Sequence, residues 1–354
     1  MPRWHGRTAS ALQIAPDAEL LKAAGRLARL AGRASPRALA TLAGGMNNRV
    51  FRVEIDGGAP VVLKSYFHDP RDPRDRLATE WRFLTYAWAR GVRAIPEPLA
   101  HEPTSHMALY GFVSGAKIAA GAVTDAHVET AADFVLAINA PPRTPTMLPP
   151  GSEACFSLAQ HVATVRRRVG RLSDLAPDAP LRTDAQRFVV DRLRPIWRRL
   201  EARIDREART NGFSLDQELN PADCCLSPSD FGFHNALEDE GGRITFLDFE
   251  YAGRDDPAKL VCDYFCQPEV PVPMSHFESF LERAAAGLGL DSAIRDRCHL
   301  LLDAYRVKWT CIMLNDFLAV GAARRAFADA GAWERRCRAQ LTRAEAKLSE
   351  IRNP

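Results

Sequence analysis

The sequence has little net charge, few cysteines and no long hydrophobic run. Its 47 Lys and Arg residues nearly balance 44 Asp and Glu residues, and the small positive excess is spread along the chain. Nucleic acids and anionic membranes bind clustered basic side chains, so both are disfavoured as partners. No stretch of about 18 uncharged apolar residues occurs, so the sequence predicts no membrane-spanning helix.

The eight cysteines are too sparse in 354 residues for a disulfide framework, so we expect reduced thiols. Cys262 and Cys266 stand four residues apart, but no second Cys or His pair has ligand spacing, which disfavours a structural zinc. The first residues include basic side chains but no apolar stretch before Asp17, which argues against a secretory signal. A cytoplasmic location is the resulting expectation.

The composition is that of an ordinary globular protein, with 46% hydrophobic and 26% charged residues. At roughly 100–200 residues per domain, this length predicts two domains or lobes. In the first part, helical periodicity predicts helices over 17–33 and 74–90. Runs of β-forming residues predict an antiparallel sheet, with strands at 38–42, 50–55, 61–64, around Leu99 and at 107–113.

After Ser114-Gly115 the pattern changes to long helices. Between Cys224 and Tyr251, turn residues frame two short β-like runs that predict a hairpin, and Asp256 before Pro257 predicts a helix N-cap. We therefore predict an α+β protein with a small β-rich lobe over 1–113 and a larger, mainly helical lobe over 114–354. The helices are expected at about 123–140, 156–172, 183–211, 275–288, 293–320 and 331–351.

The predicted hairpin carries the residues best suited to chemistry. Asn235 follows Asp230 by five residues, and Asp248 ends the second β-like run. A carboxylate can orient a hydroxyl and accept its proton, while an Asn oxygen and a second carboxylate are hard ligands suited to Mg²⁺. Each residue alone is more often a turn residue than a functional one, but the joint pattern is more specific.

This hairpin resembles the catalytic loop and metal-binding aspartate of the aminoglycoside phosphotransferase and choline kinase group, which has a bilobal protein-kinase-like fold. The resemblance implies an ATP- and Mg²⁺-dependent O-phosphotransferase. It makes Asp230 the catalytic base, with Asn235 and Asp248 as Mg²⁺ ligands. Glu250, two residues later, either binds a second Mg²⁺ or pairs with solvent.

The N-terminal part supplies further elements in the order of this family. The run from Leu42 to Phe51 places Gly and Asn residues between β-like runs, as in a loop that covers nucleotide phosphates. Lys64 and the later Glu80 resemble the strand lysine and helix glutamate of kinases. The run from Leu109 to Gly115 resembles the linker that hydrogen-bonds adenine. The implied nucleotide-binding residues are Gly44, Gly45, Asn47, Asn48, Lys64, Glu80, Gly111, Phe112 and Val113.

The residues before Asp230 depart from the family pattern, because Pro228-Ser229 stands where members usually carry His-Gly. This difference puts the rigidity of the loop and the rate of turnover in question. Two alternatives therefore stay open: a kinase-like nucleotide-binding regulatory module with impaired catalysis, and an adenylyl transferase on the same fold. Protein phosphorylation is disfavoured, because no Ala-Pro-Glu segment follows Asp248.

The sequence identifies neither the phosphate acceptor nor the oligomeric state. Acidic and basic residues are equal in number from Asp255 to Pro354, which does not favour a polycationic aminoglycoside. A sugar, an amino alcohol or a saccharide precursor is the expected small-molecule acceptor. Candidate contacts to it are His234, beside Asn235, and Trp309, Asn315 and Asp316, for which a place in the core is the alternative.

Overall fold

The computed structural model describes residues 18–42, 48–68, 72, 74–141, 148–290, 292–319 and 330–351. The chain forms two compact units, and each is described by itself. Unit 1 consists of Met1–Lys117 and Asn235–Ala252, and unit 2 consists of Ile118–His234 and Gly253–Pro354. The boundary predicted after Val113 lies close to the end of the first segment of unit 1, whereas residues 235–252 join the N-terminal part.

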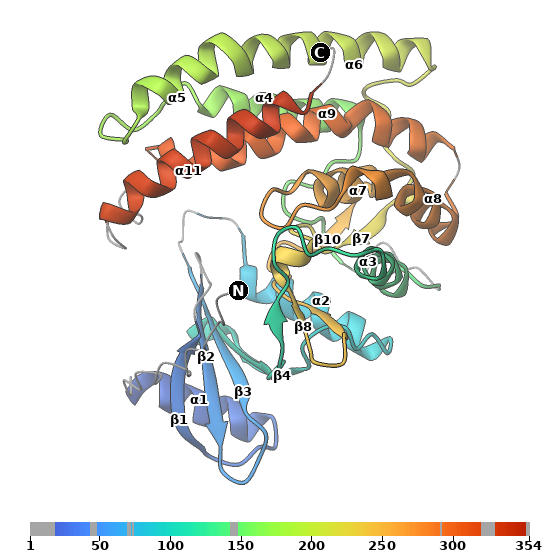
Figure 1. Ribbon diagram of the computed structural model, residues 1–354. Helices are drawn as coiled ribbons and strands as arrows, with labels where there is room; N and C mark the ends of the chain where they lie inside the picture. The colour runs from blue at the N-terminus through green and yellow to red at the C-terminus, as the bar shows by residue number, and fades with distance from the viewer. Residues whose placement is uncertain are drawn as a thin grey trace, which may run out of the picture. The chain divides into compact units, whose positions relative to one another are not determined.

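The larger of the two sheets in the described part of unit 1 is five-stranded and antiparallel (Figure 1). Helix α1 (Ala18–Leu30) packs a buried stripe that includes Leu20, Ala24 and Leu27 against the same core as the strands. Gly57, in the turn between the second and third strands, has a φ of 61°, which glycine adopts without strain. The strands are β1 (Pro36–Leu42), β2 (Asn48–Ile55), β3 (Val61–Tyr66), β4 (Pro98–Glu102) and β5 (Met107–Gly111), in the order β1-β2-β3-β5-β4.

A second, smaller sheet explains why residues 235–252 belong to unit 1. Its strands β6 (Ala116–Lys117), β8 (Ala236–Glu238) and β9 (Ile244–Phe246) pair in the order β6-β8-β9. Gly115 precedes β6 with a φ of 152°, and a Cβ there would lie 2.8 Å from the Glu238 carbonyl oxygen. Glycine is therefore required for the chain to approach the hairpin this closely.

Helix α2 (Arg76–Ala89) completes unit 1. Asp75 caps it by accepting a hydrogen bond from the Ala78 N–H. Its buried face combines Leu77, Phe83 and Leu84 with the carboxylate of Glu80. The same face also buries Arg76, one turn before Glu80. A buried carboxylate requires a cation beside it, so Glu80 needs such a partner inside unit 1.

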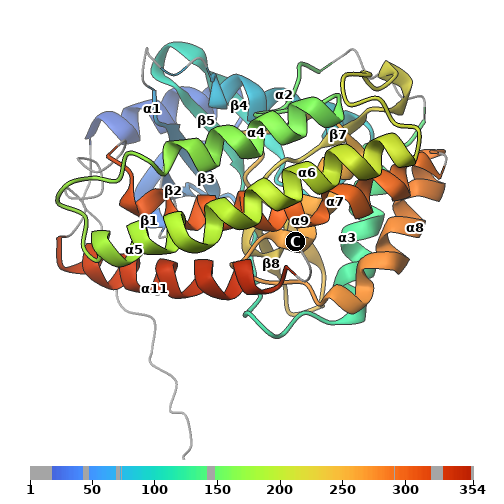
Figure 2. The same cartoon turned by 90° about the horizontal axis from the view of Figure 1, so that it is seen from above.

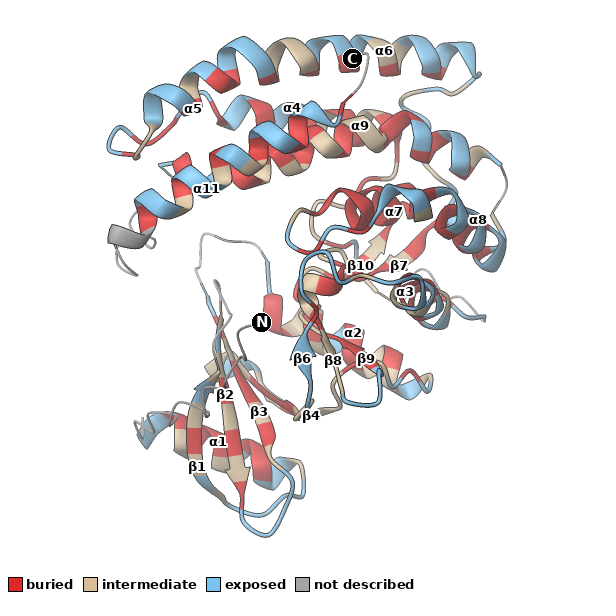
Figure 3. Ribbon diagram, viewed as in Figure 1, coloured by how far each residue is buried: buried red, intermediate tan, exposed pale blue. Residues whose placement is uncertain are grey.

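Unit 2 is mainly helical, and α4, α6, α7 and α11 all pack against α9. Figure 2 shows α4, α6, α9 and α11 running alongside one another, as they do in Figure 1. Figure 3 shows buried and exposed residues alternating along α6, as an amphipathic surface helix requires. The helices are α3 (Asp125–Ile138), α4 (Leu158–Arg171), α5 (Arg182–Phe188), α6 (Arg194–Thr210), α7 (Pro257–Cys266), α8 (Phe277–Leu288), α9 (Ala293–Met313) and α11 (Ala330–Ser349).

Two predicted helices of unit 2 differ from expectation. The single helix expected over 183–211 is divided by a π-helical turn, Val189–Leu193, which ends two residues before Pro195. Proline has no N–H to donate to the carbonyl four residues earlier, so the helical pairing changes at this point. The helix expected over 293–320 ends at Met313 and continues as a 3₁₀ turn, Leu314–Phe317.

A short antiparallel ladder, β7 (Cys225–Ser227) with β10 (Gly253–Asp255), lies in unit 2 and was not predicted from the sequence. Three-residue strands carry too short a hydrophobic pattern to be recognised. Asp256 follows β10 and caps α7 by accepting from the Ala258 N–H at 2.7 Å, which confirms the predicted N-cap. Within the ranges that the structure describes, no helix has the length and apolarity needed to cross a bilayer.

Candidate active site

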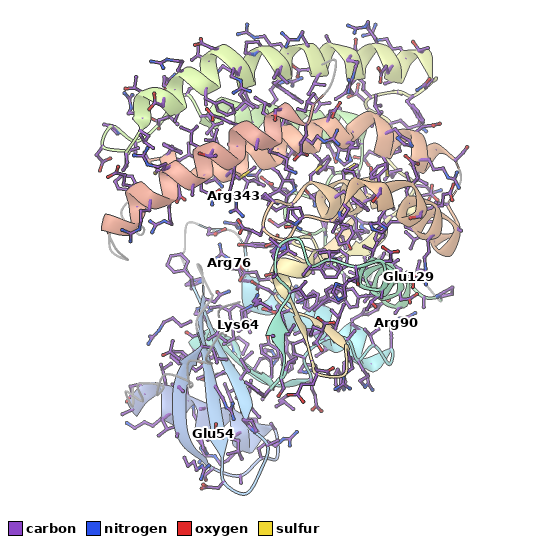
Figure 4. The ribbon with its side chains drawn as sticks, viewed as in Figure 1. Glu54, Lys64, Arg76, Arg90, Glu129 and Arg343 are labelled. Carbon is purple, nitrogen blue, oxygen red and sulfur yellow. The ribbon has the colours of Figure 1, made fainter. Side chains whose placement is uncertain are left out.

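A buried lysine lies between two carboxylates in unit 1. Lys64, on β3, donates to Glu80 Oε2 at 2.6 Å and to Asp248 Oδ1 at 2.7 Å. The Lys64 side chain, labelled in Figure 4, is 9% exposed and that of Glu80 is 5% exposed. The structure thus brings the predicted lysine and glutamate together and adds a carboxylate that is 184 residues away in sequence.

Both oxygens of the Glu80 carboxylate accept hydrogen bonds. The Tyr66 hydroxyl donates to Oε2 at 2.6 Å, and the Phe249 N–H donates to Oε1 at 3.1 Å. Burial raises the pKa of Glu80, against the opposing charge of Lys64. Burial alone would lower the pKa of Lys64, but the carboxylates of Glu80 and Asp248 outweigh it and hold that pKa above its usual value. Lys64 is therefore a fixed cation at neutral pH.

Asp248 and Asn235 lie at the same end of the β8–β9 hairpin. The Leu247 N–H donates to the Asn235 carbonyl at 2.8 Å, which closes the ladder beside Asp248. Asp248 has a φ of 66°, in the left-handed region, and its side chain is 41% exposed, whereas Glu80 is enclosed. A carboxylate and an amide are hard oxygen donors, so this pair fits Mg²⁺, and Asp248 is the carboxylate open enough to reach it.

Asp230 lies in unit 2, in the loop that follows β7. Its Oδ1 is 3.1 Å from Nε2 of His234. Phe231 and Phe233 on either side of Gly232 are buried against Tyr264 of α7, with ring centroids 5.1 and 6.0 Å away. Apolar packing on α7 thus fixes the loop, and His234 fixes the orientation of the carboxylate.

Ser229 directly precedes Asp230, at the position where the resemblance in the sequence leads us to expect glycine. Its φ is 66°, in the left-handed region that glycine adopts more easily. Its N–H donates to Ser227 Oγ at 3.1 Å, and the next N–H, of Asp230, donates to the Pro228 carbonyl at 3.0 Å. The chain therefore keeps a glycine-like turn before Asp230 at the cost of backbone strain.

The predicted nucleotide-binding residues fall into two groups. Gly44, Gly45 and Asn47 lie outside the described residues. Asn48 begins β2, where its side chain donates to Glu250 Oε2 at 2.5 Å and accepts from the Phe67 N–H at 3.2 Å. The sequence did not predict this bond between Asn48 and Glu250, because 202 residues separate them.

In the predicted linker, the Gly111 N–H donates to the Glu97 carbonyl at 2.8 Å. That N–H is already paired, so an adenine would have to use other backbone groups of Gly111, Phe112 or Val113. The Phe112 ring lies under the Arg52 guanidinium, with 4.6 Å between the guanidinium carbon and the ring centroid. This contact fixes the start of the linker to β2.

The candidate acceptor contacts in unit 2 have different surroundings. Trp309 donates its Nε1 proton to Asp263 Oδ1 at 2.9 Å, and Lys308 binds both oxygens of the same carboxylate. Asn315 is exposed, whereas Asp316 is buried and its carbonyl accepts from the indole of Trp333 at 3.1 Å. Trp309 is thus held against α7, while Asn315 faces solvent.

A buried charged cluster in unit 2 was also missed, since nothing in the sequence links its members. His161 Nε2 lies 2.9 Å from Asp256 Oδ2, its Nδ1 lies 2.7 Å from the Tyr305 hydroxyl, and Arg297 binds the same Asp256 oxygen. Burial lowers the pKa of His161, but Cys155 and Asp256 outweigh it and raise it to about 9. Burial raises the pKa of Asp256, but His161 and Arg297 outweigh it and lower it to about 2.

The fold is that of the protein-kinase-like phosphotransferases, as predicted. A spectinomycin phosphotransferase in complex with ADP and spectinomycin matches with a TM-score of 0.59 at 12% identity, over 96% of this chain and 99% of that chain. A Plasmodium vivax ethanolamine kinase matches with a TM-score of 0.56 at 12% identity, over 89% and 83%. An amicoumacin kinase in complex with AMP-PNP, Ca²⁺ and Ami matches with a TM-score of 0.56 at 14% identity, over 95% and 94%.

The family model of the phosphotransferase enzyme family matches residues 38–293, which is more than half of the chain. The chain belongs to this phosphotransferase enzyme family. The matched region contains Lys64, Glu80, Asp230, Asn235 and Asp248. The comparison with curated proteins found no match.

Proposed function

We propose that the protein is an ATP- and Mg²⁺-dependent O-phosphotransferase that acts on a hydroxyl group of a small molecule. The observation that carries this proposal is Lys64 held between the enclosed Glu80 and the more open Asp248. Phosphoryl transfer needs a fixed cation at the nucleotide phosphates and a carboxylate for the metal. The ADP and AMP-PNP in complexes of related structures support a nucleotide as the donor.

Each proposed role has an occupant in the described chain. Asp230 accepts the proton of the acceptor hydroxyl. The hydroxyl oxygen of the acceptor forms a bond to the γ-phosphorus of ATP, and the bond from that phosphorus to the leaving ADP breaks. His234 keeps the Asp230 carboxylate oriented. Asn235 and Asp248 would hold Mg²⁺, which when bound neutralises charge on the phosphate oxygens. Lys64 contributes its positive charge to the same phosphates.

We propose a sugar, an amino alcohol or a saccharide precursor as the acceptor. The spectinomycin and ethanolamine in the names of related structures support an alcohol of modest size. His234, Trp309, Asn315 and Asp316 remain proposed acceptor contacts. Of these, Asn315 is the exposed one, and it is therefore the first to test by substitution.

The test is an ADP-release screen with purified protein, Mg·ATP and a panel of sugars, amino alcohols and antibiotics. Once an acceptor is found, Asp230→Ala should lower kcat by about 10²–10⁴-fold, as expected for a lost general base, and change Mg·ATP affinity by no more than a few-fold. Asp248→Ala should lose both activity and Mg·ATP affinity. Asp133→Ala, which removes an exposed carboxylate on α3, is the control and should behave as the wild-type protein.

Three outcomes would contradict the proposal. Full turnover by Asp230→Ala would remove that residue from the role of base. Release of pyrophosphate in place of ADP would identify an adenylyl transferase. Tight Mg·ATP binding with no transfer to any hydroxyl of the panel would favour a regulatory module, the alternative that Pro228-Ser229 suggests.

A further inference from the structure

A second polar network in unit 1 starts at Asn48, the residue that directly follows the glycine-containing run 43–47. Its Nδ2 donates to Glu250 Oε2 at 2.5 Å, while its Oδ1 accepts from the Phe67 N–H at 3.2 Å. Both ends of the amide are therefore used. An aspartate could accept from Phe67 but could not donate to Glu250, so this geometry requires an amide at position 48.

Glu250 faces a cation with its other oxygen. Its side chain is 2% exposed, and Oε1 lies 3.8 Å from Nε of Arg76. Arg76, labelled in Figure 4, also binds Asp72 at 2.7 Å and the Phe67 carbonyl at 3.3 Å. This burial shows that the expectation of solvent pairing for Glu250 was wrong, because its oxygens face Asn48 and Arg76.

The segment from Asp248 to Glu250 is fixed at each of its three residues. Asp248 binds Lys64, and the Phe249 N–H donates to Glu80. The Phe249 ring stacks on Phe83 with 4.4 Å between centroids, and Glu250 binds Asn48. Closely packed groups of this kind resist independent displacement. The position of Asn48 is therefore tied to that of Asp248 through one buried carboxylate.

We propose that Glu250 is a positioning residue that holds the first residue of β2 at a fixed place relative to Asp248. The inference rests on the proposed function, in which Asp248 binds the metal of the nucleotide, together with the expectation that Asn48 lies beside the nucleotide phosphates. In this proposal Glu250 contacts neither the phosphates nor the metal. Its bond to Asn48 keeps the start of β2 at a fixed place relative to the metal ligand, so that both meet the same phosphates.

An exchange of amide and acid tests this role. Asn48→Asp places a second carboxylate against Glu250, while Glu250→Gln replaces the original acid with an amide. With both substitutions, the new amide can donate to the new carboxylate, which still accepts from Phe67. Binding of a fluorescent ADP analogue is measured in EDTA and in Mg²⁺, with melting temperatures recorded for every variant.

We expect Asn48→Asp to weaken nucleotide binding about 10-fold in both buffers, and the double variant to return to within about 3-fold of the wild-type protein, as two directly coupled residues should. Glu102→Gln removes an exposed ion pair with Arg26 in the same unit and is the matched control. If Asn48→Asp does not fold, Asn48→Ala takes its place. We expect Asn48→Ala to weaken nucleotide binding about 3-fold, and adding Glu250→Ala to it should weaken binding no further.

Unchanged affinity in Asn48→Asp, or a double variant no better than that single one, would overturn the inference. So would a loss in Glu250→Gln that occurs in Mg²⁺ but not in EDTA, because that pattern identifies a metal ligand. A wild-type protein that binds no nucleotide in either buffer would instead overturn the proposed function, before any variant is compared.

Discussion

Glu80→Gln should destabilise unit 1 more than any exposed charge substitution. Glu80 accepts from Lys64, Tyr66 and Phe249, and an amide would retain one acceptor oxygen while turning an NH₂ group toward donors. Removing one partner of a buried ion pair costs about 3–5 kcal/mol when the remaining charge is left alone. Lys64 keeps Asp248 as a partner, so we expect a smaller loss of about 2–4 kcal/mol.

Thermal unfolding followed by circular dichroism measures this loss. At about 3 °C per kcal/mol for a unit of this size, the melting temperature should fall by roughly 6–12 °C. The control is Glu19→Gln, which removes an exposed ion pair with Lys22 on α1 and should leave the melting temperature unchanged. A Glu80→Gln protein that melts with the wild-type protein would refute the reasoning, because the buried carboxylate would then contribute nothing that an amide cannot.

Two further predictions concern unit 2. Ser229→Gly should raise the free energy of unfolding by about 1 kcal/mol, because it relieves the left-handed strain at φ 66°. Ser229→Ala keeps the Cβ and should show no such gain. A denaturant titration measures both. The pKa of His161 is about 9 in the folded protein, above its ordinary value of 6.5. Protonated His161 therefore stabilises the fold fully below about pH 6.5, and this stabilisation is lost as the pH rises through 9. Urea midpoints of wild-type and His161→Gln proteins should therefore differ most near pH 6 and converge above pH 9. A constant difference across this range would contradict the assignment of charge to His161. The groups facing its ring are Asp256, Tyr305 and Cys155, and Arg297 binds the same Asp256 oxygen.

Much of the fold was predictable because its signals are local. The alternating strands of the first sheet, the turn at Gly57 and the helix that carries Glu80 follow from side-chain periods and turn residues a few positions apart. The family resemblance depended on similarly short spacings, such as that from Asp230 to Asn235. The short ladder of β7 with β10 and the π-helical turn before Pro195 were missed, since three to five residues do not establish a period.

The candidate site was only partly predictable. The sequence proposed Lys64 with Glu80 and the hairpin with Asn235 and Asp248, and the structure adds the bond that joins Lys64 to Asp248. The burial of Arg76 and Glu250 was not foreseen. An acid after a short strand and an arginine at the start of a helix give the same sequence pattern whether they are buried or exposed.

The amino-acid sequence by itself determined the order of the elements, the amphipathic faces and the reactive groups available, since each depends on neighbours within a helical turn or a hairpin. Only the tertiary structure decided which charges are buried together: Lys64 with Asp248, Asn48 with Glu250, and His161 with Asp256 and Arg297. The physical reason is that the packing of distant elements decides which buried charges come into contact. The partners lie 184 and 202 residues apart, and the sequence pattern around each residue is compatible with many other pairings.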